Sequence, residues 1–275
     1  MSKPEFADLC EAVRSAPCAV VAGSGSIAKN VALGNAVTLR APAGIVAHTP
    51  DELTLKVLAG TPVEEIHEAL SVRGQRLRMP SIGTIGGAVA TRRNGIHPET
   101  NATLPNTLLM ARFVSGRGEL VTGGGPTVKN VSGFDVNKIL VGSWGVFALI
   151  VEMTLRVEPT PACSRWFSGT SAAAARAVPL LYRPNVCHDS DNGWIVCLEG
   201  HPQDVAEQAK LLNDFVEVAQ PSTAEQLASL GGCSRPPSPV DTDPAIRGVL
   251  NRLKSTFDPD HKLNPHLWAE AKHAL

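Results

Sequence analysis

Two glycine-containing segments in the first half of the chain have the residue types and spacing to hold a large ligand. Gly23 and Gly25 lie in "VVAGSGS", directly after an apolar stretch, and Gly86 and Gly87 lie in "TIGGAVATRRNG". Glycines let a backbone turn sharply and point successive N–H groups into one concavity, which is a common way to hold phosphate oxygens. At the second segment, two absent Cβ atoms would let a flat ring or a diphosphate lie against the main chain. The pattern predicts binding of a phosphate-bearing cofactor.

The first glycine segment, taken alone, leaves other interpretations open. Its letters also fit G-x-G-x-x-A, the dinucleotide fingerprint of Rossmann folds. The context is unfavourable, because residues 26–35 make a poor helix and no acidic residue ends the next strand to bind a ribose hydroxyl. Arg40 could meet the 2′-phosphate of NADP, so that alternative stays open, as does a glycine turn without a ligand. The second cluster favours a flavin held between two lobes, since a Rossmann fold does not require it.

Side chains for acid–base or metal chemistry are less conspicuous. Among eight scattered histidines, His97 is the candidate base because it follows the second glycine cluster. Arg92 and Arg93 beside that cluster are either a solvated pair, a contact between lobes, or cations that hold a phosphate or carboxylate. The six cysteines show no C-x-x-C spacing. We therefore predict no metal site and expect reduced thiols in a reducing compartment.

Composition excludes several classes of protein. The chain has 275 residues, a net charge of −1 and 4% aromatic residues, which argues against a nucleic-acid-binding protein. The apolar, uncharged run from Ile139 to Val151 has thirteen residues, whereas a membrane-spanning helix needs about 20. Acidic residues interrupt the amino-terminal segment, so it does not read as a signal peptide. We expect a cytoplasmic protein with no direct membrane insertion.

The hydrophobic pattern of the first half predicts a sheet-rich unit. Strands are expected at 18–22, 36–40 and 53–57, followed by a strand–turn–strand over 107–125 and a long strand over 147–159. A helix is expected between Thr61, as its N-cap residue, and Gly74 at its end.

Beyond Pro159 the composition becomes rich in alanine and proline, which predicts a domain boundary there. A strand is expected at 194–200, an amphipathic helix at 202–219, a proline-rich loop at 231–244 and a helix near 245–256.

Five segments occur together in an order that resembles one known family. They are "VVAGSGS", "GTPVEEIHEAL", "TIGGAVATRRNG", the long run from "SGRGELVTGGG" through "VKNVSGFDVNKILVGSWG" to "RVEP", and the closing "FDPDHKLNP". They resemble the FAD-binding flavoproteins of the vanillyl-alcohol-oxidase or PCMH type, and among these the FAD-binding subunit of bacterial glycolate oxidases. The resemblance implies an α+β fold, a two-lobed PCMH-type FAD-binding domain with a short α+β cap domain. The implied domains are an FAD-binding domain over 1–159, a cap over 160–244, and a C-terminal helix and tail over 245–275 that return to the FAD-binding domain.

The resemblance also implies an FAD site. Residues 23–26 would cradle the pyrophosphate, the segment from Thr84 to Gly95 would line the flavin, and two residues of the long strand would lend backbone groups to the adenine end. The expected FAD contacts are Ala22, Gly23, Ser24, Gly25, Ser26, Pro80, Thr84, Ile85, Gly86, Gly87, Ala90, Thr91, Gly95, Leu149 and Ile150. The chain departs from the family at Ala22, where an arginine is usual, and at Ala148, where a glycine is usual. Because the first loop has no histidine or cysteine, FAD is expected to be non-covalent.

The function implied is that of a subunit. The chain lacks the "HxGDGN"-like motif of the catalytic relatives, and its cap region is short. We expect an FAD-binding subunit of a glycolate (2-hydroxy acid) oxidase or dehydrogenase, in a supporting or electron-transferring role. Its partners would be a catalytic flavoprotein subunit and an iron–sulfur subunit. Two alternatives stay open: a stand-alone FAD-dependent oxidoreductase for a small hydroxy acid or alcohol, and a scaffold subunit that has lost FAD.

Overall fold

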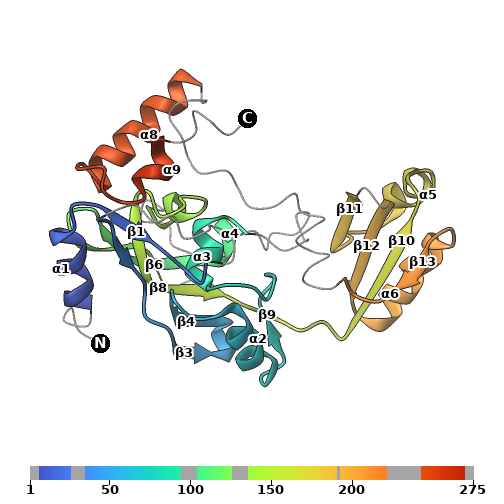
Figure 1. The fold of residues 1–275 in the computed structure, drawn as a ribbon. Coiled ribbons are helices and arrows are strands. Elements are labelled where there is room, and N and C mark those ends of the chain that lie inside the picture. Colours follow the sequence, from blue (N-terminus) through green and yellow to red (C-terminus); the bar gives the residue numbers. More distant parts are fainter. Residues whose placement is uncertain are drawn as a thin grey trace.

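The computed structural model describes residues 6–25, 35–93, 104–125, 136–190, 193–221 and 243–269. It contains a five-stranded sheet with helices on both sides and, further along the chain, a four-stranded sheet with its own helices (Figure 1). This mixture of helix and sheet confirms the predicted α+β class.

The elements are as follows. The described α-helices are α1 (Ala7–Ser15), α2 (Val63–Ser71), α3 (Ile85–Ala90), α4 (Leu104–Thr107), α5 (Ser171–Ala177), α6 (Pro202–Ala209), α8 (Pro244–Phe257) and α9 (Pro265–Ala269). The described strands are β1 (Ala19–Val21), β2 (Val37–Leu39), β3 (Ile45–Thr49), β4 (Thr54–Leu58), β5 (Gln75–Arg76), β6 (Leu108–Ser115), β7 (Leu120–Gly124), β8 (Ala148–Arg156), β9 (Glu158–Pro159), β10 (Cys163–Gly169), β11 (Val186–Ser190), β12 (Gly193–Gly200) and β13 (Val216–Val218). The five-stranded sheet has the order β3-β4-β8-β6-β7 and the four-stranded sheet the order β11-β12-β10-β13. Strand β1 pairs in parallel with β2, and β5 pairs antiparallel with β9.

Strand β8 lies at the centre of the five-stranded sheet and is buried along all but its last residue. Leu149 and Val151 pack toward α1 and β1, and the opposite face of the strand packs toward α2. This long apolar run is predicted by its sequence, because a strand covered on both faces need not alternate with polar residues. The one charged group inside it, the carboxylate of Glu152, lies 3.0 Å from Lys56 Nζ and 3.4 Å from a guanidinium nitrogen of Arg112. A buried charge of this kind is tolerated because it is paired.

Helix α2 begins differently from the sequence-based prediction. Thr61 was expected to cap it, but the residue before the helix is Pro62, and no side chain caps the first turn. The Thr61 hydroxyl donates instead to the Leu58 carbonyl at 2.7 Å and accepts from the Gly44 N–H at 2.8 Å. It therefore ties the end of β4 to the chain that leads into β3. Gly74 takes a φ of +61° three residues after the helix, where the chain turns toward β5.

The four-stranded sheet corrects a second prediction. The helix expected over 202–219 ends much earlier, since α6 stops at Ala209 and a single 3₁₀ turn follows. Val216 to Val218 then form β13, which pairs antiparallel with residues 166–168 of β10. Two β-branched residues fit a pleated edge better than a helix, and an available sheet edge overrides the helical pattern.

The end of the chain packs on its beginning. The Ala19 N–H donates to the Lys262 carbonyl at 2.8 Å, and the Asn264 N–H donates to the Ala19 carbonyl at 2.9 Å, so residues 262–264 extend the β1–β2 pair. In Figure 1 the helices α8 and α9 accordingly lie over β1. Asp243 caps α8 by accepting from the Ala245 N–H at 2.8 Å.

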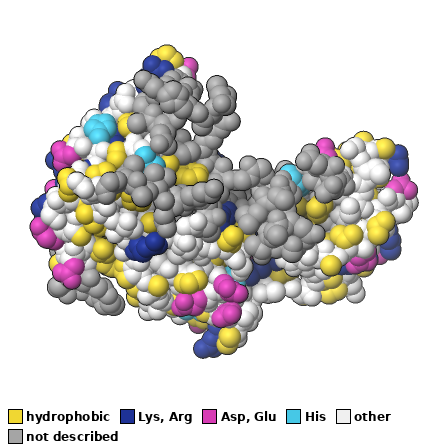
Figure 2. Space-filling model, in the orientation of Figure 1, with side chains coloured by type: hydrophobic (Ala, Val, Ile, Leu, Met, Phe, Trp, Pro, Cys, Tyr) yellow, Lys and Arg dark blue, Asp and Glu magenta, His cyan; other side chains and the backbone are white. Residues whose placement is uncertain are grey.

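The surface carries both signs of charge. On the face shown in Figure 2, the coloured acidic and basic side chains are interspersed rather than gathered into one patch of a single sign. Within the described part of the chain, no helix has the length and apolar character needed to cross a membrane.

Candidate cofactor site

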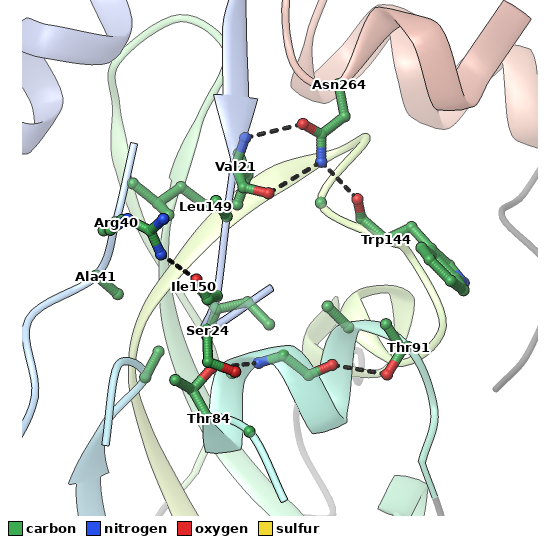
Figure 3. Close-up of a pocket in the computed structure, with 18 of the residues that line it drawn as sticks. Val21, Ser24, Arg40, Ala41, Thr84, Thr91, Trp144, Leu149, Ile150 and Asn264 are labelled. Atoms are coloured by element: carbon green, nitrogen blue, oxygen red, sulfur yellow. Dashed lines mark hydrogen bonds between the residues drawn. The ribbon is translucent and has the colours of Figure 1, made fainter. Parts of the chain in front are cut away.

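A cavity of about 220 Å³ lies where four parts of the chain meet: the loop after β1, helix α3, the start of β8 and the C-terminal tail (Figure 3). Cofactor pockets more often measure roughly 300–1,000 Å³, so the described residues enclose only part of a site for a large ligand. The pocket brings together most of the residues that the resemblance assigned to FAD. These are Ala22, Gly23, Ser24, Gly25, Thr84, Gly86, Gly87, Ala90, Thr91, Leu149 and Ile150.

The remaining assigned residues are placed elsewhere or are not described. The Ile85 side chain is fully buried in the core. Pro80 is buried in the segment before α3, where its carbonyl accepts from the Ile82 N–H at 2.8 Å, and it is not part of the pocket lining. Ser26, Gly95 and His97 lie outside the described residues.

The loop after β1 approaches the start of α3 closely. Gly25 has a φ of +77°, which lets the chain turn away from β1. A Cβ atom on Gly23 would lie 2.9 Å from Thr84 Oγ1 and 3.8 Å from the Gly87 Cα. The absent side chain at Gly23 therefore leaves open a gap between two backbone segments. Arg40, at the end of β2, donates from its guanidinium to the Gly23 carbonyl and fixes the loop from the other side (Figure 3).

The paired glycines of "TIGGAV" form the first turn of α3. Thr84 caps this helix, since its hydroxyl accepts from the Gly87 N–H at 3.2 Å. A Cβ on Gly86 would lie 2.8 Å from both the Ala59 carbonyl oxygen and the Ala59 Cβ, and the Gly86 N–H donates to that carbonyl at 2.8 Å. Gly86 therefore has a reason to be glycine within the protein: it lets α3 pack against the turn after β4. Gly87 also lines the pocket, but no backbone atom packs against it as Ala59 packs against Gly86. A Cβ on Gly87 would meet only the Thr84 hydroxyl, at 3.1 Å.

The two arginines after α3 have opposite environments. Arg92 is exposed and has a φ of +51°, a left-handed conformation that ends the helix and costs a non-glycine residue roughly 1–2 kcal/mol. Arg93 then turns inward, with 4% of its surface exposed, and lines the pocket. One of its terminal nitrogens donates to the Ile82 carbonyl at 3.0 Å. The adjacent pair is thus split into a solvated cation and a buried one.

The C-terminal tail supplies the wall opposite α3. The Asn264 side chain accepts from the Val21 N–H at 2.8 Å and donates to the Trp144 carbonyl at 2.7 Å, joining β1 to the loop before β8 (Figure 3). Next to it, His266 and Leu267 line the pocket, as does Trp144. Sequence reasoning named none of these as site residues. The signal available was the "LNPHLW" segment that follows the recognisable "FDPDHK" tail.

A buried ion pair holds this wall in place. Lys254 and Asp258 are both fully buried, with Lys254 Nζ 2.6 Å from Asp258 Oδ2. Lys254 also donates to the Val146 carbonyl at 2.6 Å, and Asp258 accepts from the Leu263 N–H at 2.9 Å. Burial lowers the pKa of Lys254, and the bond and charge of Asp258 partly offset that effect.

The electrostatics of the pocket favour an anionic ligand. Its described lining includes the guanidinium groups of Arg40 and Arg93, and no aspartate or glutamate is found among the described lining residues. A loop with a glycine gap and two cations beside it suits a group that carries negative oxygens.

Comparison with known proteins identifies that group. Residues 5–124 match the model of a family described as the FAD binding domain. The match covers less than half of the chain, and FAD is the cofactor that it indicates. The glycine loop and α3, which line the pocket, both lie within the matched residues. The gap at Gly23, which a Cβ would fill, and the acid-free lining both fit a diphosphate-bearing cofactor.

Several known proteins are similar to parts of this chain. The chain is 33% identical to glycolate oxidase subunit GlcE of Escherichia coli over 136 residues, which is 48% of this chain and 39% of that protein. It is 35% identical to D-2-hydroxyglutarate dehydrogenase of Xanthomonas citri pv. viticola over 114 residues, covering 39% of this chain and 24% of the relative. A crystal structure of alkyldihydroxyacetonephosphate synthase superposes with a TM-score of 0.63 at 16% identity, over 80% of this chain and 51% of that one. The last likeness shows the fold alone, and the chain spans about half the length or less of each relative.

Proposed function

We propose that the chain is an FAD-binding subunit of a glycolate or related 2-hydroxy acid oxidase, in a supporting or electron-transferring role. Its partners would be a catalytic flavoprotein subunit and an iron–sulfur subunit. The observation that carries the proposal is the convergence of two glycine segments and the tail on one acid-free pocket, in a chain similar to a protein named as a glycolate oxidase subunit. The six cysteines are dispersed along the sequence with no C-x-x-C spacing, which supports a reducing, cytoplasmic location.

Residues of three elements would hold FAD. The backbone of Gly23 to Gly25 and the Arg40 side chain would bind the diphosphate, and the backbone face of α3 at Gly87 would lie against the cofactor. The tail and Trp144 would close the pocket and exclude water. Bound FAD supplies a two-electron acceptor. No covalent link is proposed, because residues 22–26 include no histidine or cysteine.

A second candidate is a stand-alone FAD-dependent oxidoreductase, and one observation favours it. His266 lines the pocket, and a histidine within reach of a substrate hydroxyl is a common general base. If the chain turns over glycolate or lactate with an artificial electron acceptor when it is purified alone, and His266→Gln abolishes that turnover, this candidate replaces the first. Turnover that appears only when the partner subunits are added supports the subunit role.

The primary test is the visible absorbance spectrum of the purified protein, repeated on the supernatant after acid precipitation. We expect a flavin spectrum that moves into the supernatant, because the cofactor is not covalently attached. Colour that stays in the pellet would contradict non-covalent binding. A colourless protein to which added FAD does not bind would instead support the scaffold alternative.

A glycine substitution locates the FAD in this pocket. Gly23→Ala places a Cβ 2.9 Å from the Thr84 hydroxyl that caps α3, so we expect FAD to bind at least roughly tenfold more weakly, since about 1.4 kcal/mol is tenfold. Gly248→Ala is the matched control, because a Cβ there meets nothing within 4 Å and alanine favours the helix. Equal FAD affinity in the two variants would place the cofactor elsewhere.

A further inference from the structure

The pocket contains a buried cation whose charge is not neutralised by any described residue. Arg93 is 4% exposed and lines the pocket, yet no carboxylate among the described residues pairs with it. Its Nε is buried and, within the described part of the chain, has no hydrogen-bond partner. A buried guanidinium left in this state is costly unless an anion completes it. The arrangement therefore leaves Nε available to an anionic group in the pocket.

The local backbone directs Arg93 into this position. Arg92, in its left-handed conformation, reverses the chain, and the Arg93 N–H donates to the Ala88 carbonyl at 2.8 Å. The Arg93 side chain then runs back beside α3, so that one terminal nitrogen reaches the Ile82 carbonyl. Ile82 lies only two residues before Thr84, whose hydroxyl borders the gap at Gly23. The guanidinium is therefore held beside the segment that leads into the start of α3.

A second guanidinium approaches the same loop from another element. Arg40 follows β2 and donates to the Gly23 carbonyl, so it stands on the far side of the loop from α3 (Figure 3). Two cations from different elements thus line the same pocket as the glycine loop, and the described lining of that pocket has no acid. The residue directly before the loop, Ala22, contributes no charge of its own.

We propose that Arg93 is an oxyanion-binding residue, and that with Arg40 it binds a phosphate-class group in the pocket. In the FAD-loaded protein that group is the diphosphate of the cofactor, so this assignment rests on the proposed function. The charge favours a diphosphate, since its two negative charges match two guanidinium groups whereas the carboxylate of a small acid carries one. The planar fork of arginine suits either oxyanion, and the source is settled by experiment.

The adjacent arginine provides the matched control. Arg92→Gln and Arg93→Gln remove the same charge from neighbouring positions, but only Arg93 lines the pocket. We would measure, on the full chain freed of FAD, the dissociation constants of FAD and of inorganic pyrophosphate. On the FAD-loaded protein we would record the change that oxalate causes in the flavin spectrum.

We expect Arg93→Gln to weaken FAD and pyrophosphate by about 10- to 100-fold, the range for one hydrogen-bonded charged group. Arg92→Gln should change neither by more than about twofold, because an exposed charge contributes little. That result assigns the anion to the cofactor. If FAD binds both variants equally but Arg93→Gln abolishes the oxalate effect, the oxyanion site stands and its ligand is a carboxylate. If the two variants match in every measurement, the proposal is overturned.

Two further observations keep the test decisive. Should Arg93→Gln fail to fold, as judged by circular dichroism, Arg93→Lys retains the charge but loses Nε; we expect it to bind pyrophosphate more weakly than the Arg92→Lys control. Equal binding by the two lysine variants would overturn the role of Nε. If the wild-type chain binds pyrophosphate but no FAD, the proposed function fails while the anion site still stands.

Discussion

Two ion clusters hold different parts of this molecule, and their surroundings differ. The pair Lys254–Asp258 is fully buried and fixes the C-terminal tail against β1. Lys254 Nζ donates to Asp258 and to the Val146 and Leu263 carbonyls, and these three bonds use all the N–H donors of its ammonium group. No water is needed to satisfy this pair.

The second cluster joins the β5–β9 pair to the four-stranded sheet. Arg76 contacts Glu158 at 2.8 Å and Glu199 at 2.5 Å, and Arg78 contacts the same two carboxylates. The Arg76 and Glu158 side chains are 25% and 32% exposed, so water reaches this cluster. Although burial opposes it, bonding to Glu199 and Glu158 raises the pKa of Arg76.

The difference concerns redundancy. In the second cluster each carboxylate has two arginines, and water reaches Arg76 and Glu158, so the loss of one group leaves the others compensated. In the buried pair each charge has a single opposite charge, and the loss of one leaves an uncompensated ion inside the protein. We therefore expect the loss of one charge to destabilise the tail contact strongly and the contact of the four-stranded sheet only weakly.

Replacement of Lys254 should give the largest effect. Lys254→Met leaves the Asp258 carboxylate buried without a cation, and we expect a loss of about 3–5 kcal/mol in the free energy of unfolding, measured with urea. FAD binding should fall as well, because the tail carries a wall of the pocket. Arg252→Met, an exposed change on the same helix, should stay within about 0.5 kcal/mol of wild type. A Lys254→Met protein as stable as this control would show that the tail contact does not depend on the Lys254–Asp258 pair.

Replacement of Asn264 tests whether the tail matters through its hydrogen bonds. Asn264→Ala removes the contacts with Val21 and Trp144, and buried groups left unsatisfied cost roughly 1–3 kcal/mol. Because Asn264 has a φ of +43°, Asn264→Gly serves as the comparison, since glycine accepts that conformation without strain. We expect both variants to lose stability and FAD affinity, with alanine the worse. If the glycine variant behaves like wild type, Asn264 matters because it accepts the left-handed backbone conformation and not because of its side-chain hydrogen bonds.

Replacement of Glu199 should have a smaller and more local effect. Glu199→Gln removes one carboxylate of the second cluster, and we expect faster proteolysis near residues 159–163 with a stability loss of about 1 kcal/mol. FAD affinity should not change. Glu217→Gln, in an exposed pair with Arg165 on the same sheet, is the control and should leave the proteolysis pattern unaltered. A drop in FAD affinity for Glu199→Gln alone would show that the two sheets are coupled.

A change in salt concentration should have the smallest effect of these tests, and it should affect the two ion clusters differently. Raising the ionic strength from about 0.1 M to 1 M shortens the Debye length from roughly 10 Å to 3 Å, which screens partly exposed charges far more than buried ones. Proteolysis near residues 159–163 should therefore accelerate in NaCl, whereas proteolysis of the tail near residues 258–264 should not change. Salt-accelerated cleavage of the tail at constant pH would contradict a fully buried tail contact.

Much of the first sheet could be predicted from local sequence. The strands β1, β4 and β8 and the β6–β7 hairpin lie where apolar runs and glycine turns predicted them, because both signals act over a few neighbouring residues. Strand β13 was missed, since Val216 to Val218 continue a helical pattern and become a strand only when β10 offers an edge. The prediction that Thr61 caps α2 is wrong for a similar reason, because its hydroxyl bonds to a residue distant in the sequence. Its hydroxyl bonds to Gly44, seventeen residues earlier, and local pattern contains no information about that contact.

The candidate site divides in a similar way. The sequence by itself determined the two glycine segments, because backbone that must turn or pack closely restricts residue type at those positions. Only the tertiary structure decided that Arg93 is buried while Arg92 is exposed, and that Asn264 and His266 share a pocket with a loop some 240 residues earlier. The physical reason is that burial and charge compensation depend on which surfaces meet. That meeting is set by the packing of the tail on β1, which no short stretch of the chain encodes.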